Sequence, residues 1–404
     1  MKVVTTAADT DRADGAAAVL RTTTAVRERA RFLAERARNG ESHWFTVDDA
    51  ALATAADEVA DVTRARFPDL NIPFHSRWRH FEAGGVDRTA ALDVHAMVDL
   101  AVVSVLLDAG AGPDWHYDET SSGQRFARSE GLGVASWHAF TAGLFSSDPA
   151  TRQQVDSTGL RCLTVDRLSD AFQVDPSNPL VGLAGRVAVL HRLGDAVAQQ
   201  PDVFGAHGRP SGLFDVLVAA PGSVTAADIL ARVLTCFAPI WPADNVIGDQ
   251  PLGDCWRHAA VPGPGLTAGW MPFHKLSQWL TYSLLEPFGR AGVRVEDVDG
   301  LTGLPEYRNG GLLLDAGVLA LRDPALANKS WSVGDELVVE WRALTVALLD
   351  ELAPLVRARL GVAQDRLPLA CVLEGGTWSA GRALAQRLRG GLPPLLIDSD
   401  GTVF

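Results

Sequence analysis

Residues 335–360 read DELVVEWRALTVALLDELAPLVRARL. Within them, Leu344, Leu348, Leu352 and Leu355 recur at the spacing that places side chains on one face of an α-helix. The stretch therefore predicts a long amphipathic helix.

Similar patterns elsewhere in the chain favour a mainly α fold. Sustained alternation of apolar and polar residues, which is typical of half-buried strands, is rare. We therefore predict a compact multi-helix fold with little β-structure, as a single unit over residues 1–404 or as two lobes, 1–215 and 216–404. The other predicted helices cover residues 14–37, 42–66, 90–109, 273–288 and 311–321, and a last one runs from a turn at 374–378 through Arg389.

Composition limits the classes of protein and partner. The 404 residues are 47% hydrophobic, enough for a large core, and carry a net charge of -13, which disfavours nucleic acid as a partner. The four cysteines form no close pair, which fits a reducing compartment. Neither a run of about 18 apolar residues nor a signal-like start is present, so we expect a cytoplasmic protein without membrane contact.

The most informative segment for function is LTGLPEYRNGG, residues 301–311. It places Glu306, Tyr307 and Arg308 side by side, and two glycines allow close approach of the backbone. Such a turn can point a carboxylate into a cavity. The alternative is a loop that Glu306 and Arg308 merely fix through pairing with neighbours.

A polar stripe precedes this segment on the helix predicted for 273–288. Lys275, Gln278, Tyr282 and Glu286 share one face, which either lines a site or meets solvent. His274 and Lys275 stand at the helix start, where unpaired N–H groups favour an anion such as a substrate phosphate. A solvated helix start explains the pattern equally well.

Two further segments carry polar groups that need partners. In the apolar helix 90–109, His95 and Asp99 lie four residues apart, and we expect Asp99 to pair with His95 or with an arginine of the segment 77–79. Such a pair is either structural or holds the loop that bears His80 against a substrate. In EGGTW, residues 374–378, Thr377 is a candidate helix cap and the glycines a weak anion motif.

Other chemistry has little support. Cys255 and His258 supply only two metal ligands without zinc-like spacing, so we expect no metal and no cofactor. Serine hydrolase, P-loop and Rossmann motifs are missing. The proline-rich and tryptophan-rich stretch 241–272 is expected to wrap a site rather than to act as a linker.

Four motifs make the chain recognisable over nearly its whole length. It closely resembles the uracil catabolism protein 4 family, and the motifs are SRWRHF (76–81), FHKLSQWLTYSL (273–284), the block 301–315 and EGGTW (374–378). A fainter likeness links the chain to queuosine salvage proteins, which are nucleotide N-glycosidases with a helical fold similar to DNA glycosylases. That likeness rests on Phe273, Lys275 and Gln278, on Leu301, Thr302 and the acid-Tyr-Arg block 306–308, and on GDELVVEWR, residues 334–342.

The resemblance implies hydrolysis of a ribosyl C–N bond, with ribosylurea or its 5'-phosphate as the small-molecule substrate. Glu306 would stabilise the cationic sugar and orient water, although the salvage family has Asp at this place and another acid where this chain has Ser283. The expected oligomeric state is open. The candidate substrate-binding residues are Tyr307, Arg308, Lys275, Gln278, Tyr282, His274, Arg77, Arg79, His80 and Trp378. The indoles of Trp78, Trp270 and Trp378 are expected to exclude water from the site. The residues expected to give structural support are Asp99, His95, Glu340 and Arg342.

Two alternatives remain open at the level of sequence. One is another enzyme of uracil breakdown, an amidohydrolase or a transferase. The other is a noncatalytic nucleotide-binding protein of the pathway, in which Glu306 is only structural.

Overall fold

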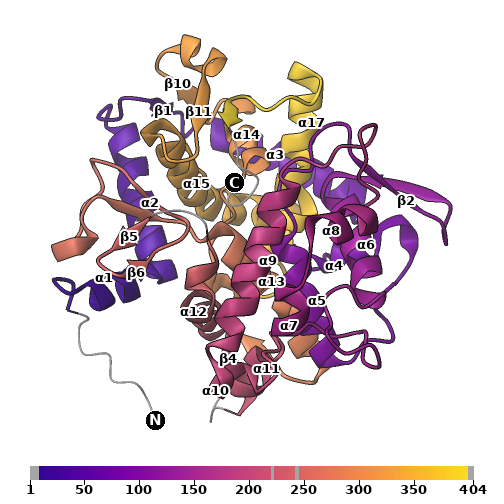
Figure 1. Cartoon of the computed structure of the whole chain (residues 1–404). Helices are drawn as coiled ribbons and strands as arrows, with labels where there is room; N and C mark the ends of the chain where they lie inside the picture. Colours follow the sequence, from indigo (N-terminus) through magenta and orange to yellow (C-terminus); the bar gives the residue numbers. More distant parts are fainter. Residues whose placement is uncertain (1–8, 220–222, 242–244, 399–404) are drawn as a thin grey trace.

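A computed structural model describes residues 9–219, 223–241 and 245–398, and it is built mainly from helices (Figure 1). The first half of the chain contains α1 (Ala13–Leu20), α2 (Thr23–Arg38), α3 (Ala51–Arg66), α4 (Trp78–Phe81), α5 (Val94–Leu106), α6 (Arg128–Thr141), α7 (Ser157–Arg161), α8 (Val165–Ala171), α9 (Leu183–Ala198), α10 (Pro201–Phe204) and α11 (Gly212–Val218). The second half contains α12 (Ala226–Cys236), α13 (Lys275–Arg290), α14 (Tyr307–Asp315), α15 (Glu336–Leu360), α16 (Leu369–Val372), a π-helical turn η6 (Leu373–Thr377) and α17 (Trp378–Arg389). Five 3-10 turns connect these helices: η1 (Ala83–Gly85), η2 (Ala238–Ile240), η3 (Gly265–Thr267), η4 (Val298–Gly300) and η5 (Pro324–Asn328).

Strands occur only as two-stranded pairs in the described residues, which confirms the mainly α prediction. The antiparallel pairs are β1 (Phe45–Val47) with β10 (Leu319–Leu321), β2 (His116–Glu119) with β3 (Gln124–Ala127), β5 (Val246–Ile247) with β6 (Gln250–Pro251), and β7 (Cys255–Arg257) with β8 (Trp270–Pro272). The parallel pairs are β4 (Val224–Thr225) with β9 (Val295–Glu296) and β11 (Ser330–Ser332) with β12 (Leu396–Asp398).

Several predicted helices differ in their bounds from the patterns, and the helix expected over 90–109 spans only Val94–Leu106. The helix expected over 14–37 is divided between α1 and α2, because the Thr22 hydroxyl caps α2 by accepting the N–H of Ala25 at 3.1 Å. The helix expected from Ser42 begins only at Ala51, and the one expected to Leu321 ends at Asp315. The residues lost from these two helices form β1 and β10, which pair with each other across the fold.

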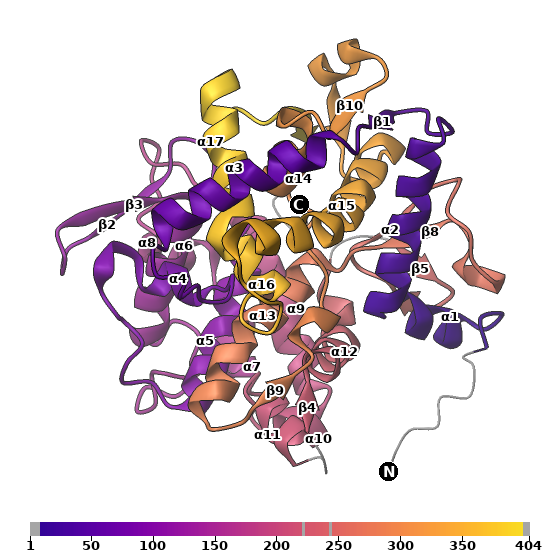
Figure 2. The same cartoon turned by 180° about the vertical axis from the view of Figure 1, so that it is seen from behind.

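The long helix α15 lies at the centre of one layer. It packs against α2 and α3, which come from the start of the chain (Figure 2). The helix α13 packs against α5 and α12, and α14 packs against α15 and α17. One hydrophobic core contains buried side chains from Val26 to Leu395, so both halves of the chain contribute to it.

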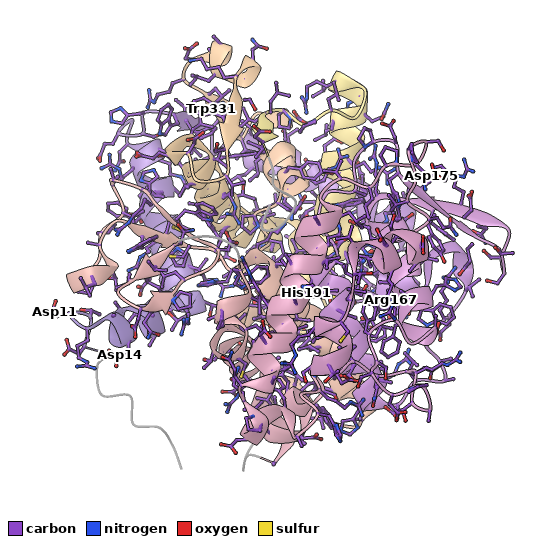
Figure 3. The ribbon with its side chains drawn as sticks, in the orientation of Figure 1. Asp11, Asp14, Arg167, Asp175, His191 and Trp331 are labelled. Atoms are coloured by element: carbon purple, nitrogen blue, oxygen red, sulfur yellow. The ribbon has the colours of Figure 1, made fainter. Side chains whose placement is uncertain are left out.

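Charged groups lie mostly outside this core. Acidic side chains such as Asp11, Asp14 and Asp175 are exposed on the surface (Figure 3), consistent with the net charge of -13. Among the described residues, no helix has both the length and the apolar character needed to cross a bilayer.

Candidate functional site

Glu306 is the N-cap residue of α14, and its side chain folds back onto the start of that helix. Its two carboxylate oxygens accept the N–H groups of Arg308 at 2.7 Å and Asn309 at 2.6 Å. The side chain is half-buried, and this burial raises its pKa, while the two N–H groups and the nearby Lys275 and His75 act in the opposite direction. The carboxylate is therefore recessed, held in one orientation by two backbone N–H groups and within electrostatic range of Lys275.

The loop that leads to Glu306 is anchored to α13. Gln278 donates from Nε2 to the Thr302 hydroxyl at 2.6 Å and accepts the Thr302 N–H at 2.8 Å. The Tyr282 hydroxyl donates to the Thr302 carbonyl at 3.0 Å. Because Gln278 and Tyr282 are completely buried, their polar atoms position the loop 301–306 from behind.

The start of α13 already holds an anion, the carboxylate of Asp254. Asp254 accepts the Lys275 N–H at 2.9 Å and binds both terminal nitrogens of Arg342, at 2.7 and 2.8 Å. Burial alone would raise the pKa of Asp254, but the Arg342 guanidinium outweighs it and holds this pKa at about 2. The predicted anion site at this helix start is thus filled by the chain itself.

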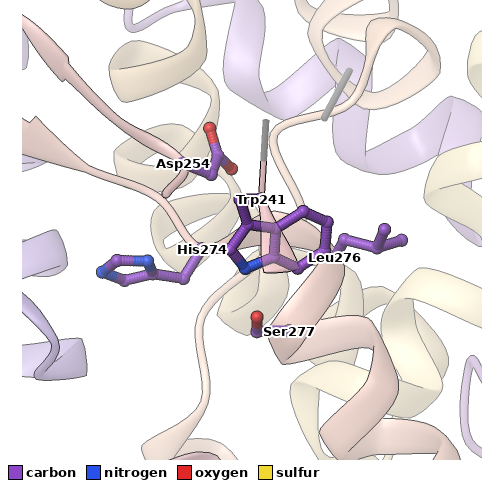
Figure 4. A pocket seen from close by; sticks show the side chains of 5 residues that line it. All are labelled: Trp241, Asp254, His274, Leu276 and Ser277. Carbon is purple, nitrogen blue, oxygen red and sulfur yellow. The ribbon is translucent and has the colours of Figure 1, made fainter. Parts of the chain in front are cut away.

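A hollow lies beside Asp254. It is lined by Trp241, Asp254, His274, Leu276 and Ser277 and is too narrow to admit a water molecule (Figure 4). The His274 ring bonds to the carbonyl of Leu20 at 3.0 Å and so faces α1. The segment 241–272 reaches this hollow through Trp241 and Asp254, whereas its Trp270 belongs to a separate small core with α1.

Lys275 is the first residue of α13 and lies within electrostatic range of Glu306. Its side chain is half-buried, and burial lowers its pKa, with Arg342 adding to the effect and Glu306 and Asp254 opposing it. The carboxyl with a raised pKa and the amine with a lowered pKa therefore lie within electrostatic range of each other. This is the perturbation expected of a site that excludes water.

The segment 76–81 packs its basic groups into the interior. Arg77 is fully buried, with Nη1 at 2.9 Å from Asp108 and Nε donating to Ser104 at 2.7 Å. Its Nη2 has no hydrogen-bond partner among the described residues. Arg79 instead forms half-buried ion pairs with Glu286 and Glu82, at 2.8 and 3.0 Å.

Ser283, which stands where the salvage proteins have an acid, holds this segment. Its hydroxyl accepts the N–H of Arg77 at 3.0 Å, and its carbonyl accepts the indole N–H of Trp78 at 2.6 Å. The buried Trp279 stands one turn earlier on α13. Its ring centre lies 5.6 Å from the Arg77 guanidinium carbon and 5.9 Å from the centre of the His80 ring. Ser283 thus has a structural task in this fold.

Sequence reasoning missed His75 and the carboxylate of Glu374. The His75 Nδ1 lies 2.8 Å from a Glu374 oxygen, and Arg66 binds the other oxygen of Glu374 at 3.0 Å. The His75 ring lies 6.4 Å from the ring of Trp279. Their places in the sequence could have indicated them, because His75 directly precedes the motif 76–81 and Glu374 is the first residue of EGGTW.

The prediction for residues 374–378 is wrong in its local structure. Thr377 has helical dihedral angles and caps nothing, since α16, η6 and α17 follow one another without a break. The glycines permit close packing on α3, because a Cβ on Gly376 would lie 2.5 Å from both the Thr63 hydroxyl and the Val59 carbonyl. Trp378 is half-buried, with the Arg382 guanidinium 5.8 Å from its ring.

The expected partners of Asp99 are also wrong. Arg209 binds Asp99 at 2.7 Å, and the N–H groups of Val155 and Ser211 complete its shell, while His95 pairs with Asp215 at 2.9 Å. Burial is the largest influence on Asp99 and raises its pKa despite Arg209. These groups join α5 to the loops that follow it in the chain.

The remaining predicted residues lie around α14 and α15. Tyr307 is exposed, and the Arg308 guanidinium lies 4.8 Å from its ring and donates to the Gly391 carbonyl at 3.4 Å. Glu340 accepts from the Ser42 hydroxyl and lies 3.0 Å from His258. Within the described part of the chain, no three His, Cys, Asp or Glu side chains gather in a way that would hold a metal ion.

Comparison with known proteins agrees with the motifs. Residues 19–404 match the family model described as a protein of unknown function (DUF1688). The chain belongs to this family. It is 39% identical over 399 residues to Protein urg3 of Schizosaccharomyces pombe, a match that covers 94% of this chain and 96% of that protein. It is also 39% identical over 378 residues to Uracil catabolism protein 4 of Lachancea kluyveri, covering 83% of this chain and 85% of that protein.

Proposed function

We propose that the chain is an enzyme of uracil breakdown that hydrolyses the ribosyl C–N bond of ribosylurea or its 5'-phosphate. The name of the Lachancea kluyveri relative, Uracil catabolism protein 4, supports the pathway. The observation that carries the chemistry is the recessed Glu306 carboxylate, fixed by the N–H groups of Arg308 and Asn309 beside Lys275.

A fixed carboxylate suits this reaction for electrostatic reasons. Cleavage of the C–N bond leaves positive charge on the ribose ring, and a preorganised anion stabilises that charge more than it stabilises the neutral substrate. Glu306 also orients the attacking water and accepts its proton. Because its carboxylate is already held by two backbone N–H groups, it pays little reorganisation energy during the reaction.

Three basic residues of the candidate site are considered for the 5'-phosphate. Lys275 is the first candidate, because its charge lies within electrostatic range of Glu306 on the adjacent helix start. Arg77 is the second, because its Nη2 lacks a hydrogen-bond partner among the described residues. Arg79 is less suited, since its guanidinium already pairs with two glutamates.

Urea release from the purified protein tests the proposal. We expect urea and a ribose product from ribosylurea, its 5'-phosphate or both. Glu306→Gln should lower kcat by about 10² to 10³-fold while substrate binding is largely kept. Glu296→Gln, the same change at an exposed position in β9, should leave kcat unchanged.

Other outcomes would identify the alternatives. An amidohydrolase or transferase would consume a pathway intermediate without releasing urea. A noncatalytic binding protein would bind the substrate without turnover, and Glu306→Gln would then leave pathway flux in cells unchanged.

A further inference from the structure

The proposed reaction needs a proton donor as well as an anion. When the C–N bond of a ribosylurea breaks, the electron pair remains on a urea nitrogen, and a urea anion is far too basic to leave in water near neutral pH. The nitrogen must therefore receive a proton as the bond breaks. Glu306 cannot supply it while ionised to stabilise the sugar cation, so a second group is required.

His75 has the geometry of such a donor. Its Nδ1 lies 2.8 Å from Glu374, and its backbone N–H donates to the Ala370 carbonyl at 3.0 Å, which fixes both the ring and the chain that carries it. A carboxylate bonded to one imidazole nitrogen keeps a proton on that nitrogen and leaves the other nitrogen for the substrate. The ring is half-buried, so solvent does not compete fully for it.

The surroundings of the Glu374 carboxyl favour its ionised form. Burial would raise its pKa, but His75 and Arg66 outweigh burial and lower it. Arg66 also binds the Glu374 and Gly375 carbonyls, so the carboxylate is held from both its side chain and its backbone. A permanent anion beside Nδ1 determines which imidazole nitrogen it bonds and leaves the other nitrogen available.

The dyad and Glu306 belong to one region of the fold. The turn η6, which carries Glu374, packs against α14, whose N-cap is Glu306. Trp279, which contacts the His75 ring, lies one turn after Lys275 on α13. The His75 ring is thus held between Glu374, on the turn that packs against α14, and Trp279, on the helix that carries Lys275.

We propose that His75, oriented by Glu374, is the general acid that protonates the leaving nitrogen, an inference that rests on the proposed function. The C1'–N bond breaks with its electron pair on nitrogen, and that nitrogen takes the proton from the substrate-facing nitrogen of His75. Water adds its oxygen to C1' and gives a proton to Glu306. Exchange with solvent then returns a proton to His75 and removes one from Glu306, so urea and ribose leave with no other reactant.

A comparison of two leaving groups tests this role. The urea nitrogen of ribosylurea must be protonated as it leaves. A 4-nitrophenyl β-ribofuranoside instead releases 4-nitrophenolate, a stable anion that needs no proton to leave. Both substrates are offered in free and 5'-phosphorylated form. His75→Gln should lower kcat/KM for ribosylurea by about 10² to 10⁴-fold but stay within about tenfold of wild type for the nitrophenyl riboside. Glu374→Gln should show the same division, and Glu306→Gln should lose activity on both substrates.

The control and the contrary outcomes are distinct. His95→Gln makes the same change at a more exposed histidine that pairs with Asp215, and it should resemble wild type on both substrates. Equal losses on both substrates in His75→Gln, or no loss on ribosylurea, would overturn the acid role while leaving the hydrolase function intact. Wild-type protein that cleaves neither substrate would overturn the proposed function and this inference together. Should His75→Gln fail to fold in a thermal melt, Glu374→Gln decides the comparison.

Discussion

Glu306 and Lys275 influence each other's charge across the gap between two helix starts. Burial raises the pKa of the Glu306 carboxyl and lowers the pKa of the Lys275 ammonium, and each charge partly offsets the effect on the other. In the proposed reaction Glu306 must be ionised. Activity should therefore be lost as the pH falls through its raised pKa, so the acid limb lies above the ordinary value of 4.5.

Lys275→Met should move that limb to higher pH. The substitution removes a positive charge that favours the carboxylate, so the pKa of Glu306 rises further. The measurement is the pH dependence of kcat/KM for ribosylurea. Lys329→Met, the same change at an exposed lysine, should leave the limb in place. A limb that moves to lower pH in Lys275→Met would contradict the coupling.

At the scale of the element, the position of α14 depends on glycines that let helices approach closely. A Cβ on Gly381 of α17 would lie 2.2 Å from the Arg308 carbonyl, and one on Gly310 would lie 2.7 Å from the Trp341 ring. The Trp341 indole donates to the Gly310 carbonyl at 3.2 Å. Close contact with α15 and α17 thus sets where Glu306, at the start of α14, can lie.

Gly381→Ala should therefore destabilise the protein. The new methyl group meets backbone, which must shift, and we expect a loss of about 1 to 3 kcal/mol in the free energy of unfolding. Gly289→Ala is the matched control, because nothing lies within 4 Å of a Cβ at this position of α13. Alanine there should stabilise the helix by about 0.5 to 1 kcal/mol. Denaturant unfolding of both variants checks the opposite signs, and equal effects would refute the packing argument.

At the scale of the whole molecule, half-buried and buried ion pairs connect distant parts of the chain. Arg27 of α2 binds Asp350 of α15 at 2.8 Å and donates to the carbonyls of residues 299–301, directly before the loop that ends at Glu306. Arg88 and Glu119 form a second pair, with nearly complete burial of both side chains. Arg88 also donates to the carbonyls of Phe81, Ala83 and Val86, so it closes the turn after α4.

The Arg88–Glu119 pair should make the fold sensitive to acid. Its hydrogen bonds to Arg88 lower the pKa of Glu119 from 4.5 to about 2. The resulting stability, on the order of 3 kcal/mol, is present above pH 4.5 and is lost as the pH falls toward 2. Glu119→Gln should lower the free energy of unfolding by about 3 to 5 kcal/mol at pH 7, because it removes the charged partner of a buried arginine. Below pH 4.5, the free energy of unfolding of this variant should depend less on pH than that of the wild type. Denaturant unfolding between pH 2 and 7, with Glu296→Gln as the exposed control, measures both.

Local pattern in the sequence was sufficient for the helical class and for the segment around Glu306. Helix periodicity and Gly and Pro breaks act over a few residues, so α15, α13 and α5 could be predicted with bounds within a few residues. The motifs also led to the prediction that Glu306, Lys275 and the segment 76–81 belong to one candidate site. Their roles in catalysis stay predictions.

Pairings between distant segments were decided only by the tertiary structure. His75 and Glu374 are 299 residues apart, Asp99 and Arg209 are 110 apart, and β1 pairs with a strand near residue 320. No local propensity specifies such partners, because each contact depends on how α3, α5, α13 and α15 pack in three dimensions. The sequence by itself therefore determined which segments are helical and which carboxylate begins α14. Helix packing alone decided which charges surround that carboxylate, because burial and neighbouring groups, not residue type, set its pKa.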